Sequence, residues 1–429
     1  MTLAKPEEES ELVAALARAY AHSPFWRHRL QAIGVGEHDF KLGFPFAELP
    51  LLTKPELLED QAAHPPFGRL RSVELDQVRR VHRTSGTMGV PLFIALTERD
   101  IRDTYVASCR AFKLAGIGPG DRIVHCLNFN MWSGGLTDYL PLEELGATGV
   151  PFGVGNTSML LRTIRALGIN AISCTPSYML VLGDRCREEL QIAPTELGLR
   201  RGYFGGEGLL QVPGVREEIE STFGLTAIDA NYGMSEVLSI IAGEGPDRDG
   251  LVYHGYGIVY AELIDPDGRP VGIEAGAEGE LVFSSLRREA QPLFRYRTND
   301  LVRVMWADVG EDGLLRMKFQ VKGRTDEMLV IKGVNFFPQA LLSIFPEYER
   351  EVGRGFRVMR PQSGEPESLR IVLETHLGAG PLRDALALKI QARIASTFQV
   401  KTAVMWVPIG RIRDEGNKSR FLVDRFEDI

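Results

Sequence analysis

The sequence predicts an α/β protein with a large N-terminal domain, built on mostly parallel sheets covered by helices plus a small β region, and a smaller α+β C-terminal domain. Three observations support this prediction. Strand-like apolar runs alternate with helical patterns through the first half of the chain. Short strands and turns such as DPDGRP then replace this alternation. After Gly323 a further stretch of mixed strands and helices is long enough to fold as a domain.

Helix-capping signals mark the elements of the N-terminal domain. Thr97 is expected to begin a helix that stops at Gly116, and strand RIVHCL follows the turn GIGPGD. A second helix runs from Asn156 to Leu167, with Gly168 as its C-cap, before strand NAISCTP. A third cycle is helix VREEIESTF and strand TAIDANYG. Repeated strand–helix alternation of this kind indicates a parallel sheet covered on both faces.

The C-terminal segment follows a different pattern. We expect strand MLVIKG, a helix opening at Pro338, strands FRVMR and LRIVLET, and a last helix within PLRDALALKIQARIASTF. Pro381 suits the first turn of that last helix. Its spacing predicts a buried face made of Leu382, Leu386, Ile390, Ile394 and Phe398.

The composition and charge of the chain limit the classes of partner and the cellular compartment that we expect. The 429 residues carry a formal net charge of -8 without a polybasic block, which argues against nucleic acid or an anionic membrane as the main partner. The beginning of the chain lacks the order of a signal peptide, and no apolar run is long enough to span a membrane, so we expect a cytoplasmic protein. Four scattered cysteines indicate a reduced interior without a metal, namely Cys109, Cys126, Cys174 and Cys186.

The segment RTSGTMGVP has the composition of a phosphate-binding loop. Its glycines allow the backbone to approach a ligand, and its hydroxyl and amide groups can orient phosphate oxygens. The candidate nucleotide-binding residues here are Thr84, Ser85, Gly86, Thr87 and Gly89. Such a turn is common, and this one contains no lysine, so the charge that neutralises a polyphosphate must come from elsewhere.

Three further polar clusters follow in the order NYGMSE, RYRTND with GRTD, and GNKSR. In NYGMSE, Tyr232 can lie against a purine and Glu236 can hold Mg²⁺ between phosphates. In the next cluster, Asp300 can accept the ribose hydroxyls and Arg324 can supply positive charge. Lys418 in GNKSR is the last candidate. Each cluster alone is equally compatible with a solvated surface, and the argument depends on their combination.

The ordered motifs TSGTMGVP, NYGMSE, RYRTND, GRTDEMLVIKGVNFFP and EGNKSRF resemble those of the adenylate-forming superfamily of acyl-CoA synthetases, adenylation domains and luciferases. Within it the chain is most similar to the phenylacetate-CoA ligase family, through the early LPLLTKPELLED and the later SCTPSYML as well. The resemblance implies an acid–thiol ligase that uses ATP, Mg²⁺ and coenzyme A. The acid would first form an acyl-adenylate, and the thiol of coenzyme A would then displace AMP.

The resemblance also implies a role for each motif. Lys418 would be catalytic, and the nucleotide site would add Gly206, Glu207, Asn231, Gly233, Met234 and Ser235 to the residues already named. The expected domains are 1–323 and a mobile 324–429, with a hinge at Asp326. The C-terminal domain would present Lys418 for adenylation and then place Lys332 and Gly333 along the coenzyme A tunnel. A homodimer is an expectation from the family alone.

Family position places LNFNMWSG beside the acyl pocket. Its expected walls are Phe129, Met131, Trp132 and Gly134, with Gly205, Gly206 and Glu207 of YFGGEG forming another wall. An apolar slot of aromatic side chains suits an aryl acid, although any one of these side chains can equally be part of the core. The departure at Phe129-Asn130 leaves phenylacetate-, benzoate- and aminobenzoate-like acids open. The absence of a cysteine-rich insert after RYRTND predicts no structural metal.

Two other functions remain alternatives. One is an aryl-acid adenylating enzyme that passes the acyl group to a carrier-protein phosphopantetheine or to an amine. The other is a nucleotide-binding regulatory protein with a decayed site, against which the intact Lys418, Glu236, Asp300 and Arg324 argue.

Overall fold

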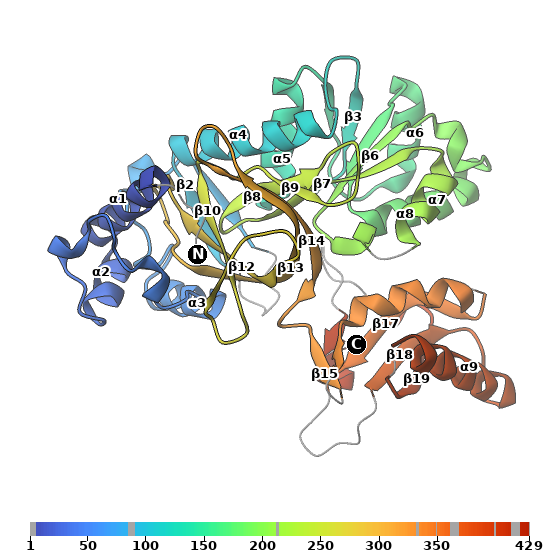
Figure 1. Ribbon diagram of the computed structural model, residues 1–429. Helices are drawn as coiled ribbons and strands as arrows, with labels where there is room; N and C mark the ends of the chain where they lie inside the picture. The colour runs from blue at the N-terminus through green and yellow to red at the C-terminus, as the bar shows by residue number, and fades with distance from the viewer. Residues whose placement is uncertain are drawn as a thin grey trace. The chain divides into compact units, whose positions relative to one another are not determined.

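The computed structural model covers the chain and describes residues 6–84, 91–211, 214–331, 334–348, 350–360, 369–398, 400–412 and 421–428. Its helices are α1 (Pro6–His22), α2 (Pro24–Gln31), α3 (Lys54–Ala63), α4 (Glu98–Leu114), α5 (Ser133–Glu144), α6 (Thr157–Leu167), α7 (Pro176–Leu190), α8 (Val215–Phe223) and α9 (Pro381–Phe398) (Figure 1).

The strands of the first part of the chain are β1 (Arg80–Arg83), β2 (Phe93–Leu96), β3 (Arg122–His125), β4 (Thr148–Pro151), β5 (Ala171–Cys174), β6 (Arg201–Gly205), β7 (Thr226–Met234), β8 (Leu238–Glu244), β9 (Leu251–Tyr253) and β10 (Val259–Ile264). The remaining strands are β11 (Pro270–Val271), β12 (Glu278–Ser285), β13 (Tyr296–Val309), β14 (Leu315–Arg324), β15 (Leu329–Ile331), β16 (Val334–Phe336), β17 (Val352–Met359), β18 (Leu369–Thr375), β19 (Thr402–Pro408) and β20 (Leu422–Val423).

Contacts divide the chain into two compact units. The first comprises Met1–Gly206 and Ile219–Lys322, and the second comprises Glu207–Glu218 and Gly323–Ile429. Both combine sheets with helices, so the predicted α/β class is confirmed. None of the helices in the described part of the chain is long and apolar enough to cross a membrane.

A sheet of 12 strands forms the centre of the first unit, in the order β11-β10-β12-β13-β14-β9-β8-β7-β6-β5-β3-β4. The strands from β4 to β7 are parallel, as the alternating pattern predicts. At β7 the direction changes, because β8 pairs with it antiparallel. The expected small β region is thus continuous with the parallel sheet, and the junction lies at the motif NYGMSE.

The predicted capping signals form as expected in the first unit. Thr97 caps α4 through a reciprocal capping box with Asp100, in which the Thr97 hydroxyl accepts from the Asp100 amide. Asn156 caps α6, and Gly168 ends it with a left-handed φ of 56° that costs glycine no steric strain. Figure 1 shows α4 and α5 along the sheet near β3 and β7.

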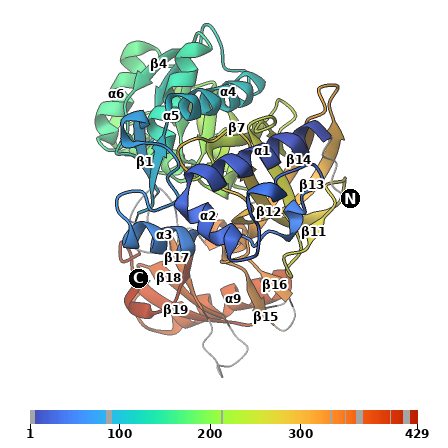
Figure 2. The same ribbon diagram turned by 90° about the vertical axis from the view of Figure 1, so that its left-hand side faces the viewer.

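The N-terminal helices pack on the antiparallel half of the sheet, where Figure 2 shows α1 and α2 in front of β12 and β13. Trp26 of α2 is 1% exposed and meets the ring of Phe294 at 5.0 Å between centroids. Its indole Nε1 donates to the carbonyl of Pro292 at 2.8 Å, so the polar atom of this buried ring is satisfied.

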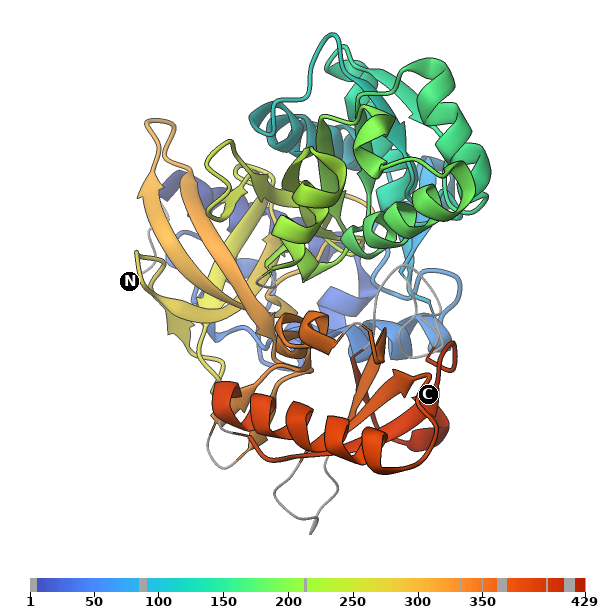
Figure 3. The ribbon, with the colours of Figure 1, turned by 90° about the vertical axis from the view of Figure 1, so that its right-hand side faces the viewer.

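The second unit contains a sheet ordered β19-β18-β17-β20, with α9 along one face (Figure 3). Leu386, Ile390 and Ile394 are buried on α9 as predicted. The prediction was wrong for Leu382, which is 77% exposed, so the buried face begins one turn later than the periodicity indicates. Pro338 opens a short 3-10 helix rather than an α-helix.

Candidate active site

The carboxyl ends of the parallel strands bring the predicted motifs to one edge of the sheet. The segment 126–134 follows β3, Thr175 follows β5, Gly206 follows β6, and NYGMSE ends β7. Ligands of open parallel sheets bind beyond this edge, where successive loops separate. The segment 126–134, Gly206 and NYGMSE are therefore at the same edge of the sheet although they are far apart in the chain.

The phosphate-loop motif begins at Thr84, which is 4% exposed. Its amide donates to the carbonyl of Leu92 at 3.0 Å, and its hydroxyl accepts from the amide of Leu92 at 3.1 Å. Thr84 thus closes the base of the loop between β1 and β2, and its hydroxyl is already engaged. Ser85, Gly86, Thr87 and Gly89 lie outside the described residues.

Tyr232 and Asp300 form a direct contact between the second and third motifs. The Tyr232 hydroxyl donates to Asp300 Oδ2 at 2.7 Å, and the Tyr232 ring meets Phe319 edge-on at 5.5 Å. Asp300 is 8% exposed, and its amide donates to the hydroxyl of Thr298 at 2.9 Å. The Thr298 hydroxyl thus holds the backbone of Asp300, and its carboxylate is oriented by the tyrosine that we expect beside the base.

A buried carboxyl group fixes the start of the second motif. Asp138 of α5 is 1% exposed, accepts a hydrogen bond from the side-chain amide of Asn231 and shares another, at 2.6 Å, with the hydroxyl of Ser239. Burial raises the pKa of Asp138 to about 8, against the effect of the two hydrogen bonds. The group is therefore protonated at neutral pH and ties α5 to both strands that meet at the parallel–antiparallel junction.

Glu236, the candidate magnesium ligand, is 8% exposed and forms an ion pair with Lys54. Its Oε1 lies 2.9 Å from Lys54 Nζ and accepts from the Tyr296 hydroxyl at 3.4 Å. Among the described residues, no group of three His, Cys, Asp or Glu side chains is arranged to hold a metal ion. Mg²⁺ needs fewer protein ligands, since one or two carboxylates and the phosphates of a nucleotide commonly suffice, and Glu236 fits that role.

Two buried histidines hold the segment assigned to the acyl pocket. His82 donates from Nδ1 to the carbonyl of Met131 at 3.2 Å, and its Nε2 accepts from Thr137 at 3.1 Å. His125 donates from Nε2 to the carbonyl of Gly134 at 3.0 Å. Because a carbonyl can only accept, these contacts fix the tautomers. Burial lowers the pKa of both histidines to about 4, so both rings are neutral.

The indole of Trp132 fills the space beside two of the predicted pocket glycines. A Cβ on Gly134 would lie 2.9 Å from the Trp132 ring, and a Cβ on Gly206 would lie 3.2 Å from it. A side chain at either position would displace the indole. Phe129 packs edge-on against the imidazole of His125 at 5.6 Å and is partly buried against the hydrophobic core of the first unit.

The remaining predicted residues of this region connect the acyl and nucleotide segments. Ser235 and Ser133 share a hydrogen bond at 2.8 Å between their hydroxyls, which joins NYGMSE to the start of α5. Gly233 and Gly205 lie where backbones cross closely, because a Cβ on Gly233 would be 2.0 Å from the Ser239 carbonyl. Met234 ends β7 and packs against the core of the first unit.

In the second unit, Arg324 and Asp326 pair with each other. The Arg324 Nε and Nη2 atoms donate to the two Asp326 oxygens at 3.0 and 2.9 Å, a bidentate contact just after β14. Glu207 begins the short segment grouped with this unit. Lys332, Gly333 and Lys418 lie outside the described residues.

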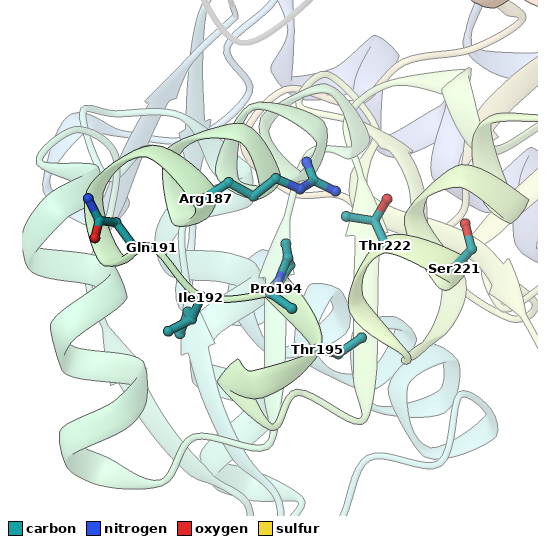
Figure 4. Close-up of a pocket in the computed structure, with 8 residues that line it drawn as sticks. Arg187, Gln191, Ile192, Pro194, Thr195, Ser221 and Thr222 are labelled. Atoms are coloured by element: carbon teal, nitrogen blue, oxygen red, sulfur yellow. The ribbon is translucent and has the colours of Figure 1, made fainter.

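A surface cavity of about 640 Å³ lies elsewhere in the first unit, between the end of α7 and α8 (Figure 4). Its lining is Arg187, Gln191, Ile192, Ala193, Pro194, Thr195, Ser221 and Thr222. None of these eight was predicted as a site residue, and Arg187 forms an ion pair with Asp184 at 3.3 Å.

Sequence reasoning did not assign Lys54, Asp138, His82 or His125, although all four contact predicted site residues. Lys54 lies within LPLLTKPELLED, a stretch that resembles the family without suggesting any chemistry. The two histidines and Asp138 lie in apolar or mixed runs, where a titratable residue gives no indication of its partner.

Comparison with known proteins gives consistent results. The phenylacetate-coenzyme A ligase of Escherichia coli (strain K12) is 32% identical over 425 residues, which cover 94% of this chain and 91% of the relative. The protein of the same name from Aromatoleum evansii is 31% identical, with 96% and 92% covered.

A crystal structure of 2-hydroxyisobutyryl-CoA ligase, in the postadenylation state with 2-HIB-AMP, superposes with a TM-score of 0.82 at 27% identity. The match covers 99% of this chain and 91% of that one. Residues 47–286 match the AMP-binding enzyme family, a range that contains the phosphate loop, the acyl segment and NYGMSE. The chain therefore belongs to the AMP-binding enzyme family, and within it to the phenylacetate-coenzyme A ligase family.

Proposed function

We propose that the protein joins an aromatic carboxylic acid to coenzyme A in an ATP-dependent reaction that releases AMP. The main support is the connected set of contacts in the first unit: Tyr232 to Asp300, and Ser235 to Ser133 at the acyl segment. These contacts support the proposal because they join Asp300, which we expect at the ribose, and the start of α5, which we expect beside the acid, to the same motif NYGMSE. The names of the relatives, acid–coenzyme A ligases, support the same reaction.

The first half-reaction is the attack of a carboxylate oxygen of the acid on the α-phosphorus of ATP. The bond from that phosphorus to the bridging oxygen of pyrophosphate breaks, and pyrophosphate leaves with the electron pair. In the second half-reaction the sulfur of coenzyme A attacks the acyl carbon, AMP leaves, and the thiol proton passes to solvent. The mixed anhydride is needed because a free carboxylate is a poor acceptor for a thiol.

Individual residues have defined tasks in this proposal. Asp300 binds the ribose hydroxyls, Tyr232 flanks the base, and Arg324 adds positive charge near the nucleotide. Glu236 would hold Mg²⁺, which supplies charge neutralisation between the phosphates when bound. Lys418 stabilises the charge that develops on the phosphate during adenylation, an effect typically worth about 10²–10³ in rate for one well-placed donor.

The C-terminal region, residues 324–429, would move about Asp326 between the two half-reactions. In one orientation it presents Lys418, and in the other it places Lys332 and Gly333 along the path of coenzyme A. The paired side chains of Arg324 and Asp326 lie at the end of β14, where such a hinge would act. Dimer formation and a cytoplasmic location are further parts of the proposal that follow from the family.

A carboxylate screen for AMP release tests the reaction. It would include phenylacetate, benzoate and aminobenzoate, with 2-hydroxyisobutyrate as the small branched acid suggested by the name of a structural relative. We expect AMP release that requires ATP, an aromatic acid and coenzyme A together. Release with 2-hydroxyisobutyrate alone would contradict the aromatic assignment.

The acceptor is tested separately from the acid. Free coenzyme A is compared with phosphopantetheine carrier proteins and with amines, at a fixed concentration of the best acid. AMP release only with a carrier or an amine would favour the alternative adenylating function. Exchange of labelled pyrophosphate into ATP then tests catalysis itself, because a decayed nucleotide-binding protein would show no exchange with any acid.

A further inference from the structure

The phosphate-loop sequence lacks a lysine, and the structure shows a lysine from a different part of the chain beside the nucleotide motifs. Lys54 is the first residue of α3, and its Nζ lies 2.9 Å from Glu236 Oε1. The Lys54 side chain is 27% exposed, whereas that of Glu236 is 8% exposed. The Lys54 side chain is therefore partly exposed to solvent, while its ammonium group contacts the second motif.

The segment that carries Lys54 is attached to the third motif by backbone hydrogen bonds. The amide of Leu52 donates to the carbonyl of Arg295 at 2.9 Å, and the amide of Arg297 donates to the carbonyl of Leu52 at the same distance. Leu52 also forms an isolated bridge with Tyr296, whose hydroxyl donates to Glu236. Lys54 is thus two residues from a direct connection to RYRTND.

Side chains fix the same segment from both ends. The buried guanidinium of Arg295, 3% exposed, donates to the carbonyl of Leu49 at 2.7 Å and also to that of Ala47. On the other side, the amide of Thr53 donates to Glu56 at 2.8 Å in a capping box that starts α3. The backbone that carries Lys54 is therefore fixed, whereas the flexible lysine side chain can still turn.

We propose that Lys54 is a phosphate-binding residue of the nucleotide site, supplied by the N-terminal segment. In the nucleotide-free protein it pairs with Glu236 and offsets the cost of burying that carboxylate. When ATP enters, Lys54 turns from Glu236 to the triphosphate. This inference rests on the proposed function only in requiring that ATP binds at these motifs.

The chemistry of the pair favours this role over a purely structural one. A lysine is a compact point charge with three rotatable donors on a flexible stem, so it can exchange a carboxylate partner for phosphate oxygens. The proposal also gives the first unit a positive charge of its own, in addition to the one expected from Lys418 of the mobile region. A structural ion pair would instead leave Lys54 on Glu236 whether or not nucleotide is bound.

The test measures nucleotide binding to the full chain by calorimetry, with ATP and adenosine as probes and EDTA present to remove metal. The variants are Lys54→Met, Lys54→Arg, and Lys113→Met as a matched control, because Lys113 is an exposed lysine near the end of α4. We expect Lys54→Met to weaken ATP binding about 10- to 100-fold, the range for loss of one charge-assisted hydrogen bond. Adenosine binding should change less than about twofold, and Lys54→Arg should retain most of the ATP affinity.

Loss of the lysine also leaves Glu236 near the phosphates, so the comparison is repeated on a Glu236→Gln background. If Lys54 binds phosphate directly, Lys54→Met/Glu236→Gln will bind ATP about tenfold or more weakly than Glu236→Gln. Equal ATP affinity of these two proteins would overturn the proposal, since the lysine would then only neutralise Glu236. The double variant removes both charges of the pair, so it also serves if Lys54→Met alone does not fold.

Failure of the proposed function would look different. A wild-type protein that binds neither ATP nor adenosine would refute the nucleotide site itself. A wild-type protein that binds both, with ATP affinity unchanged in Lys54→Met, would refute only the role of Lys54.

Discussion

Replacing Asp138 by asparagine should change how stability depends on pH. Burial raises the pKa of the Asp138 carboxyl to about 8, whereas an aspartate in an unfolded chain titrates near about 3.9. Below about pH 4 both states are protonated and the contribution of the proton to stability is fully present. Between about pH 4 and 8 the unfolded chain releases a proton that the folded chain keeps, so stability is lost as pH rises.

The size of this effect follows from one proton. The stability of wild type should fall by up to about 1.4 kcal/mol per pH unit relative to a protein without the Asp138 carboxyl group. Asp138→Asn keeps a side chain of the same shape that can hydrogen-bond to Ser239 and Asn231, and it has no proton to release. The free energy of opening of the variant minus that of wild type should therefore rise by about 3 kcal/mol between pH 5 and pH 7.

Hydrogen exchange measured by mass spectrometry on peptides from α5 provides the assay, because opening of this helix exposes Asp138. Rates at pH 5, 6 and 7 are corrected for intrinsic exchange and converted to opening free energies for both proteins. Asp308→Asn is the control, since Asp308 lies exposed on β13. A difference between Asp138→Asn and wild type that is the same at pH 5 and 7 would show that Asp138 is ionised in the folded protein and would refute the reasoning.

Three other substitutions test the site. Lys418→Ala should slow adenylate formation by a factor of about 10²–10³, while supplied acyl-AMP and coenzyme A should still give thioester. Stopped assays of each half-reaction measure the two rates. An equal loss of rate in both half-reactions would contradict the moving-domain account. Tyr232→Phe removes the 2.7 Å hydrogen bond to Asp300. Adenosine binding measured by calorimetry should weaken about fivefold, or about 1 kcal/mol. Unchanged affinity would indicate that Asp300 does not bind the ribose. Gly134→Ala places a Cβ 2.9 Å from the Trp132 ring and should displace the indole. KM for the preferred acid should then rise about tenfold while KM for ATP stays unchanged. A raised KM for ATP with an unchanged KM for the acid would show that the acid binds elsewhere.

Much of the fold could be predicted because its signals are local. The caps of α4 and α6 and the buried runs of the parallel strands depend on residues within a few positions of one another. Periodicity was less reliable at the start of α9, where Leu382 is apolar and yet exposed. Whether a helical turn is buried depends on the tertiary structure around it, which cannot be predicted from the spacing of apolar residues alone.

Part of the candidate site could also be predicted from the sequence and part could not. The polar motifs were recognisable because their composition is unusual and their order is fixed. The groups that hold them were not, since Asp138 meets Ser239 and Lys54 meets Glu236 only after distant parts of the chain come together. Burial also changes chemistry in a way that sequence does not show, as with the neutral imidazoles of His82 and His125.

The residues that match the AMP-binding enzyme family model are held in place by residues outside that match. The match covers residues 47–286, yet the segment before Lys54 is held by two arginines outside it. Arg295 donates to the carbonyl of Leu49, and Arg29 donates to the carbonyl of Leu51 at 2.7 Å. Trp26, also outside the match, contacts Phe294, again outside it. Excising residues 47–286, for a fusion or a minimal catalyst, would keep only TSGTMGVP and NYGMSE of the five motifs and would remove side chains that hold the segment before Lys54.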